Sequence, residues 1–366
     1  MVEVNWAGIA RTAKALGAEG TNFLQLRTSQ RYDVEVLDAA LPGDLADSPA
    51  NGGWSAGPSS WLLLVEGPDE QVRGWIRLLA ASLTAAGVEG TLTGAGVAAP
   101  PQWARRIATS VRPINACVGF HALGGPGFSP WAGWAAGPAA RDAVVDMGMR
   151  WLSAHGGRIM SMTPGMASFW TNRATAALML TDMVEHNGVG LAVNFDQARR
   201  ELRQASTTVP CGMTLTCEAD GYPWQQTVQE LRAMLLSAPL DLVSVAMVSH
   251  RSMSDYLMTD LTENDPYDRW AYLRHPEVWD EFVLEPNGIQ ILTDQHLEKA
   301  LDLSEWTLER LDARHVLVQA RDLAPWYGTA RRSREAVDDA VMGRARSDFG
   351  TMLLTHERAR ERGLTG

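Results

Sequence analysis

The segment WLLLVEGPDEQVRGWIRLLAASLTAAGVEGTLT, residues 61–93, contains a β-α-β pattern. Residues 61–65 are a five-residue apolar run, which predicts a buried strand. Pro68 and the two acids after it favour the first helical turn, because carboxylates are stabilised at the positive end of the helix dipole. Four residues recur every three or four positions and predict one apolar helix face: Val72, Trp75, Leu79 and Leu83. Gly87 ends this helix, and residues 88–93 predict the returning strand.

A second segment, residues 213–248, has the same order of elements. A strand at 213–217 precedes a helix that Pro223 opens, and residues 240–248 (LDLVSVAMV) predict the returning strand. The two segments agree in order and length but hardly in sequence, so both an internal duplication and a chance likeness explain them. We predict a mixed α/β fold of the α+β class with two lobes, a neutral one at 1–185 and an acidic one at 186–366, each built around a β-α-β unit.

The remaining pattern predicts a largely antiparallel C-terminal part, because residues 306–311 and 316–320 read as a hairpin. The other elements that bear on the fold are a strand at 32–37, a loop at 42–60, a strand at 114–121, a helix at 140–154 and a helix at 196–205.

Bulk composition predicts a folded, soluble protein. Hydrophobic residues make up 46% and charged residues 20% of the 366 positions, which are ordinary values for globular chains. Only two of the 32 basic residues are lysines, which favours a bacterial source with GC-rich coding. The N-terminus lacks the apolar core of a secretory signal, and no apolar run reaches the ~18 residues that span a bilayer. Since the three cysteines include no C-x-x-C pair, we expect a reduced, cytoplasmic protein.

The usual sequence motifs of enzymes and metal-binding proteins are either absent or lack the neighbouring secondary structure that they require. Gly94 and Gly96 fit a G-x-G-x-x-A pattern, but Pro100 and Pro101 follow where a dinucleotide site needs a helix. The sequence contains no G-x-S-x-G elbow and no closely spaced histidine or cysteine pair. We therefore predict no cofactor and no metal, and we expect Cys217, in the middle of a strand, to be buried.

The charge of the chain is concentrated in one stretch. Residues 1–180 carry thirteen bases and thirteen acids, whereas residues 255–312 carry four bases and fifteen acids, a difference equal to the net charge of -11 for the whole protein. An acidic field repels nucleic acid and anionic membranes and attracts a positively charged protein. The sequence thus predicts a basic protein partner.

Large aromatic residues alternate with the acids of this stretch, as in interfaces that combine anchoring side chains with charge. The candidate partner-binding residues are Asp260, Glu263, Asp265, Asp268, Trp270, Trp279, Asp280 and Glu281. The other interpretation is a solvated acidic face over an aromatic core. The clustered acids lack the spacing and the central glycine of an EF-hand calcium loop.

The glycine-rich loop at 119–138 contains His121, Trp131 and Trp134 and no charged residue. It is interpreted either as a mobile lid or aromatic recognition surface, or as a connector whose tryptophans fill the core.

Three classes of function fit these observations. The first is a non-catalytic binding protein, such as an immunity or antitoxin protein that caps a basic partner through the acidic, aromatic-rich surface. The second is an enzyme whose site is assembled from scattered residues near strand ends, with His121, His250, Arg251 and Asp255 as candidates. The third is a structural subunit of a larger assembly. The sequence leaves catalysis undecided and favours the binding protein.

Overall fold

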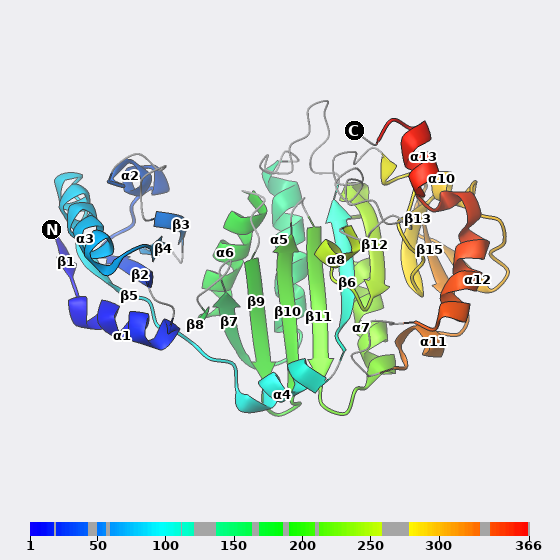
Figure 1. The fold of residues 1–366 in the computed structure, drawn as a ribbon, viewed down its shortest axis with the longest axis horizontal. Coiled ribbons are helices and arrows are strands. Elements are labelled where there is room, and N and C mark those ends of the chain that lie inside the picture. Colours follow the sequence, from blue (N-terminus) through cyan, green and yellow to red (C-terminus); the bar gives the residue numbers. More distant parts are fainter. Residues whose placement is uncertain are drawn as a thin grey trace. The chain divides into compact units, whose positions relative to one another are not determined.

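A computed structural model gives the fold of the chain (Figure 1). The structure describes residues 1–17, 20–42, 50–55, 59–110, 112–120, 137–162, 168–185, 190–208, 212–257, 278–329 and 337–364. These residues form two compact units, one of Met1–Ala99 with Arg158–Asp182 and one of Pro100–Gly157 with Met183–Gly366. This grouping differs from the predicted lobes, because residues 100–157 belong with the second unit.

The first unit is built on a five-stranded sheet. Its strand order is β1 (Val2–Val4), β5 (Gly90–Gly94), β2 (Thr21–Thr28), β4 (Ser60–Glu66) and β3 (Ala50–Ser55). β2 pairs antiparallel with both β4 and β5. The predicted β-α-β unit is therefore confirmed, with β2 lying between its two strands.

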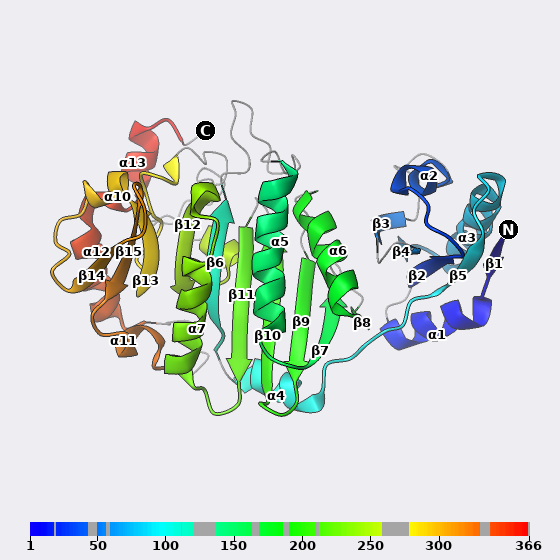
Figure 2. The ribbon, with the colours of Figure 1, turned by 180° about the vertical axis from the view of Figure 1, so that it is seen from behind.

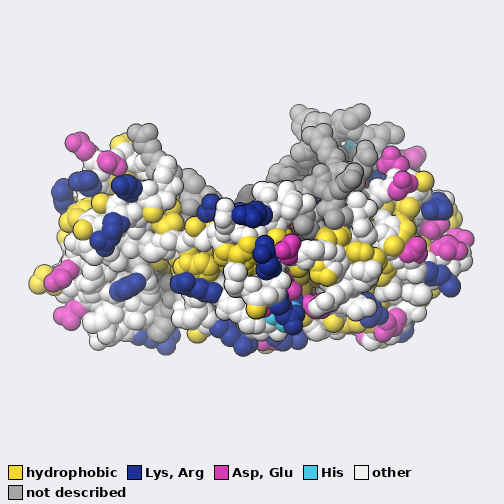
Figure 3. Space-filling model, turned by 90° about the horizontal axis from the view of Figure 1, so that it is seen from below, with side chains coloured by type: hydrophobic (Ala, Val, Ile, Leu, Met, Phe, Trp, Pro, Cys, Tyr) yellow, Lys and Arg dark blue, Asp and Glu magenta, His cyan; other side chains and the backbone are white. Residues whose placement is uncertain are grey.

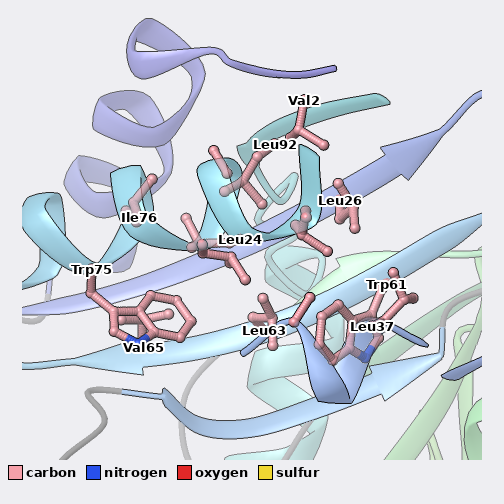
Figure 4. Close-up of a cluster of buried hydrophobic side chains, with 14 of the residues drawn as sticks. Val2, Leu24, Leu26, Leu37, Trp61, Leu63, Val65, Trp75, Ile76 and Leu92 are labelled. Carbon is pink, nitrogen blue, oxygen red and sulfur yellow. The ribbon is translucent and has the colours of Figure 1, made fainter. Parts of the chain in front are cut away.

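Helix α3 (Asp69–Ala85) shows why the segment that opens the sequence analysis folds in this way. All four residues of its predicted apolar face are buried, as are Ile76 and Ala80. Figure 4 shows Leu24 and Leu26 of β2 in one cluster with Leu63 of β4 and Trp75 of α3. Each fully buried aliphatic side chain stabilises the unit by roughly 1.5 to 3 kcal/mol, so this face holds α3 on the sheet.

The second unit contains an entirely antiparallel run of strands. Their order is β14 (Trp306–Arg310), β15 (His315–Ala320), β13 (Ile289–Thr293), β12 (Val243–Ser249), β6 (Ile114–Phe120), β11 (Gly212–Ala219), β10 (Glu201–Thr208) and β9 (Gly190–Asp196). The predicted antiparallel C-terminal part and its terminal hairpin are confirmed. The second β-α-β unit is confirmed too, with β6 between β11 and β12.

Helices cover both faces of this second sheet. α5 (Pro138–Ser153) and α7 (Trp224–Leu236) pack on one face, in front of the strands in Figure 2. α8 (Met253–Leu257) packs against β6 and β11 on the other face, in front in Figure 1. There Met253 and Tyr256 share a buried cluster with Trp279 and with Leu354 from the C-terminal segment.

The other elements are shorter or peripheral. They are α1 (Trp6–Leu16), α2 (Val34–Ala39), α4 (Gln102–Ser110), β7 (Arg158–Met162), β8 (Ser168–Trp170), α6 (Arg173–Glu185), the 3-10 turn Leu240–Leu242, α10 (Asp294–Leu297), α11 (Ala324–Tyr327), α12 (Asp339–Phe349), the 3-10 turn Gly350–Met352 and α13 (His356–Glu361).

Three expectations from the sequence were wrong. The predicted helix at 196–205 is instead the turn at 197–200 and the first half of strand β10, because pairing of β10 with β9 and β11 along its length outweighs local helix propensity. The predicted strand at 32–37 is helix α2, whose Leu37 is buried; a six-residue run of this kind fits both periods. The predicted loop at 42–60 contains β3, an edge strand paired with β4.

Candidate functional site

Several predicted site residues lie outside the described part of the chain, and their roles stay predictions. They are Asp260, Glu263, Asp265, Asp268 and Trp270 of the partner-binding set, together with His121, Trp131 and Trp134.

The described aromatic residues of the acidic stretch lie in the core. Trp279 is 1% exposed and packs in the cluster beneath α8, and Tyr256 and Phe282 belong to the same cluster. Trp306, the first residue of β14, is buried against Phe349. The interpretation of acids over an aromatic core therefore describes this half of the stretch.

Asp280 and Glu281 form ion pairs with basic residues of the same chain. Asp280 pairs with Arg314, and Glu281 binds both Lys299, at 2.9 Å, and Arg362. The hydrogen bond from Lys299 is the largest of the effects that lower the pKa of Glu281. These two carboxylates tie the segment before β13 to the residue that precedes β15, to the turn after α10 and to the C-terminal end of α13, and they offer little charge to another molecule.

Three other carboxylates face solvent. Glu298, Asp302 and Glu305 are exposed and form no ion pair with any residue that the structure describes. We call these three residues the acidic rim. Residues 294–312 hold six acids and two bases, and both bases are already paired, Lys299 with Glu281 and Arg310 with Asp294. Figure 3 shows acidic side chains gathered over the C-terminal part of the second unit, at the right of the view.

A cavity of about 250 Å³ adjoins the acidic rim at Glu305. Trp306 and Trp326 lie in it with their ring centroids 5.8 Å apart, and the Trp306 indole N–H donates to Asp348 at 3.0 Å. Its charged lining consists of Glu305, Asp322 and Asp348 with Arg321 and Arg344. We did not predict this cavity from the sequence, because Trp326 and Asp348 belong to elements that are separated from β14 along the chain.

A second cavity, of about 160 Å³, lies at the end of β12 and contains two of the four predicted catalytic residues. His250 and Arg251 line it together with Glu285 and Arg346. Glu285 is held by both arginines, at 3.0 Å from Arg251 and 3.1 Å from Arg346. Asp255 does not line this cavity. It is exposed in the first turn of α8, where its carboxylate accepts from the Ser252 N–H.

His250 is held in its neutral form. Its Nδ1 lies 2.9 Å from the Pro113 carbonyl, which only accepts, so this nitrogen carries the proton. Burial, the largest effect, lowers the pKa of His250 to about 4, and Arg112 acts in the same direction against the carbonyls of Pro113 and Trp326. A neutral imidazole beside a paired carboxylate can accept a proton. Within the described part of the chain, the cavity lining has no cysteine and no group of three metal-binding side chains.

The low pKa of His250 makes stability depend on pH. In the unfolded chain this group titrates near 6.5, so its contribution is complete above that pH and is lost as pH falls toward 4. Between pH 7 and pH 5 the loss should be about 2 kcal/mol. Replacing His250 with Asn, whose amide can still donate to the Pro113 carbonyl, should remove that component. Denaturant unfolding of both proteins at the two pH values checks this, and parallel pH dependences would contradict it.

A buried charged network is the other feature that the sequence did not reveal. Arg203 of β10 pairs with Glu201, at 2.5 Å, and with Glu230 of α7. His155 contacts Glu201 at 2.9 Å, and the Arg203 guanidinium lies 4.2 Å from the Trp151 ring centroid. Alternating Glu201 and Arg203 on one strand face was the available signal, but the erroneous helix assignment concealed it. Nearby Cys217 is buried, as predicted, and burial raises its pKa to about 12.

Comparison with protein-family models, with curated proteins and with solved structures finds no match to this chain. Among the described helices, none combines the length and the apolar character that crossing a lipid bilayer requires.

Proposed function

We propose that this chain is a binding protein for a basic protein partner, which it contacts through the acidic rim. The observation that carries the proposal is that three exposed carboxylates form no ion pair with any described residue, in a segment whose own bases are already used in ion pairs. The class of function is that of an immunity or antitoxin protein, which neutralises a basic protein by covering it.

Electrostatics defines how such a partner would bind. Clustered charge of one sign steers an oppositely charged protein and raises its association rate more than its final affinity. Salt screens exposed charges over about 8 to 10 Å near physiological ionic strength, so binding should weaken as salt rises. The cavity of about 250 Å³ beside Glu305 supports the proposal by offering a recess next to the charge.

Affinity purification with matched charge variants tests the proposal. We expect the wild-type protein to retain a basic protein in stoichiometric amount at about 150 mM salt. The variant with Glu298, Asp302 and Glu305 all changed to lysine should retain at least about ten-fold less, because attraction becomes like-charge repulsion. Mass spectrometry and band intensity provide the measurement.

The control makes the same change in net charge on the first unit, with Glu3, Glu35 and Glu70 replaced by lysine; all three are exposed. It should bind as the wild type does. Recovery of no stoichiometric basic protein, or equal loss in both variants, would count against the proposal. A further variant with lysine at Asp260, Glu263, Asp265 and Asp268 tests the predicted part of the partner-binding set.

The two other hypotheses stay open. The cavity with His250 and Arg251 favours a small-molecule site, but of the four predicted catalytic residues it contains these two and not Asp255. The structural-subunit hypothesis rests on the tryptophan content of the sequence.

A further inference from the structure

The hydrogen-bonding pattern of β14 leaves backbone groups directed away from the sheet. β14 is the terminal strand, and it pairs antiparallel with β15 in a register that places Leu308 opposite Val318. At the two ends of the pair, the Leu311 N–H donates to the His315 carbonyl and the Arg321 N–H donates to the Glu305 carbonyl. In an antiparallel pair, residues that face the neighbouring strand alternate with residues that face away.

This alternation assigns each backbone group of β14. Residues 305, 307, 309 and 311 face β15, so Leu308 and Arg310 direct their N–H and C=O groups toward the open edge. The Trp306 N–H is already bonded to the Leu303 carbonyl. Among the residues that the structure describes, no acceptor or donor meets the backbone of Leu308 or Arg310 on that side. Figure 2 shows β14 at the margin of the sheet.

Two of the usual devices that protect an edge strand, proline and bulges, are missing from β14. Proteins protect edges with proline, bulges or charges that project from the strand. β14 contains no proline and pairs with β15 in unbroken register. Its two charged side chains are drawn into ion pairs, Glu309 with Arg232 of α7 and Arg310 with Asp294 of α10. Leu308 is 51% exposed, and Leu301, in the segment before the strand, is 73% exposed.

We propose that the open edge of β14 accepts an extended, basic segment of the partner as an added strand. This proposal rests on the proposed function and names the way in which the partner would be recognised. Backbone hydrogen bonds to Leu308 and Arg310 would supply affinity, and side chains on alternate positions would supply specificity. The segment carries lysine or arginine to meet the acidic rim and an apolar side chain to cover Leu308.

Charge complementarity decides between the occupants of this edge. A second copy of the chain would place the three carboxylates of the acidic rim against the same three carboxylates, an arrangement that like-charge repulsion disfavours. The acids therefore disfavour pairing of β14 with itself. A basic strand gains from the same charges, so the edge is open to one kind of partner and closed to self-association.

The experiment uses a fluorescein-labelled ten-residue peptide of alternating lysine and valine as the probe. Its controls are the same peptide with glutamate for lysine, and the lysine peptide N-methylated on its backbone, which keeps the charge and removes the N–H donors. We expect each control to bind the wild-type protein at least about ten-fold more weakly by fluorescence anisotropy. Hydrogen exchange of the Leu308 and Arg310 amides should slow when the lysine peptide is bound.

Substitutions in β14 separate backbone pairing from charge. Leu308→Pro removes an outward N–H while leaving the ladder to β15, and it should weaken binding at least about ten-fold. Leu308→Val keeps both that N–H and an apolar side chain, so it should lose much less binding than Leu308→Pro does. Circular dichroism verifies folding, and if Leu308→Pro fails to fold, the N-methylated probe decides the question without changing the protein.

The outcomes distinguish this inference from the proposed function. If lysine at Glu298, Asp302 and Glu305 abolishes binding while Leu308→Pro or N-methylation has no effect, the partner binds the rim through side chains and the edge proposal is overturned. If the glutamate peptide binds as well as the lysine peptide, both proposals fail. A dimer of the wild-type chain that Leu308→Pro dissociates would show that a second copy occupies the edge, which also overturns the inference.

Discussion

Replacing Arg203 with leucine should lower the free energy of unfolding by about 3 to 5 kcal/mol, because it leaves the buried carboxylate of Glu201 without the arginine that neutralises it. Arg203 is 3% exposed and Glu201 is 7% exposed. The guanidinium neutralises Glu201, reaches Glu230 of α7 and lies over the Trp151 ring. Burial alone would lower the pKa of Arg203, but the hydrogen bond and charge of Glu201 raise it, so the guanidinium keeps its charge. Urea unfolding gives the measurement.

Two further variants separate charge from packing. Arg150 of α5 pairs with Asp146 at 2.8 Å, but both side chains are exposed; Arg150→Leu should therefore change stability by less than about 1 kcal/mol. Adding Glu201→Gln to Arg203→Leu should recover part of the loss, since the unpaired charge is then removed. An Arg203→Leu protein as stable as the Arg150→Leu protein would show that the network contributes nothing.

Trp279→Ala should destabilise the second unit by a similar amount, about 3 to 5 kcal/mol, the range for truncating a buried tryptophan. Trp279 contributes to the cluster of α8 with Met253 and Tyr256, and Gly119 of β6 lies close to its ring. From the sequence, we predicted that this residue belongs to a partner-binding surface. A ring that is 1% exposed can influence a partner only through the fold.

The measurement that checks this prediction is denaturant unfolding, with Leu308→Ala as the comparison. Leu308 is 51% exposed, so its truncation should change stability by no more than about 0.5 kcal/mol. A stable Trp279→Ala protein that had lost only partner binding would contradict the placement of Trp279 in the core and restore it to the interface.

The local sequence pattern was sufficient to predict the secondary structure where buried residues recur at a short, regular spacing. The apolar face of α3 and the strands on both sides of it follow from residues 61–93, because one buried face at helical spacing determines how this segment packs. The same reasoning located β11, α7 and β12. It failed at β10, where the eight residues ELRQASTT show no clear alternation and are held as a strand by pairing with β9 on one side and β11 on the other.

The candidate site, too, could be predicted from the sequence only in part. The concentration of acids in residues 255–312 and the position of His250 and Arg251 at the end of a strand can both be read from the sequence. The sequence does not show which of these acids form ion pairs, because their basic partners lie elsewhere in the chain. Asp280 pairs with Arg314, Glu281 with Lys299 and Arg362, and Glu285 with Arg251 and Arg346. A run of acidic residues in the sequence gives the number of carboxylates, but only the packing of the chain determines which of them pair with an arginine.

The sequence by itself determined the two β-α-β units, the antiparallel terminal hairpin and the acidic character of the second half, since each depends on spacing or composition along the chain. The tertiary structure alone decided that β2 and β6 lie inside those units, that Trp279 is core, that the carboxylates of the acidic rim are exposed and that β14 is an edge strand. The physical reason is that strand order, ion pairing and exposure are set by contacts between segments far apart in sequence, which no local period encodes.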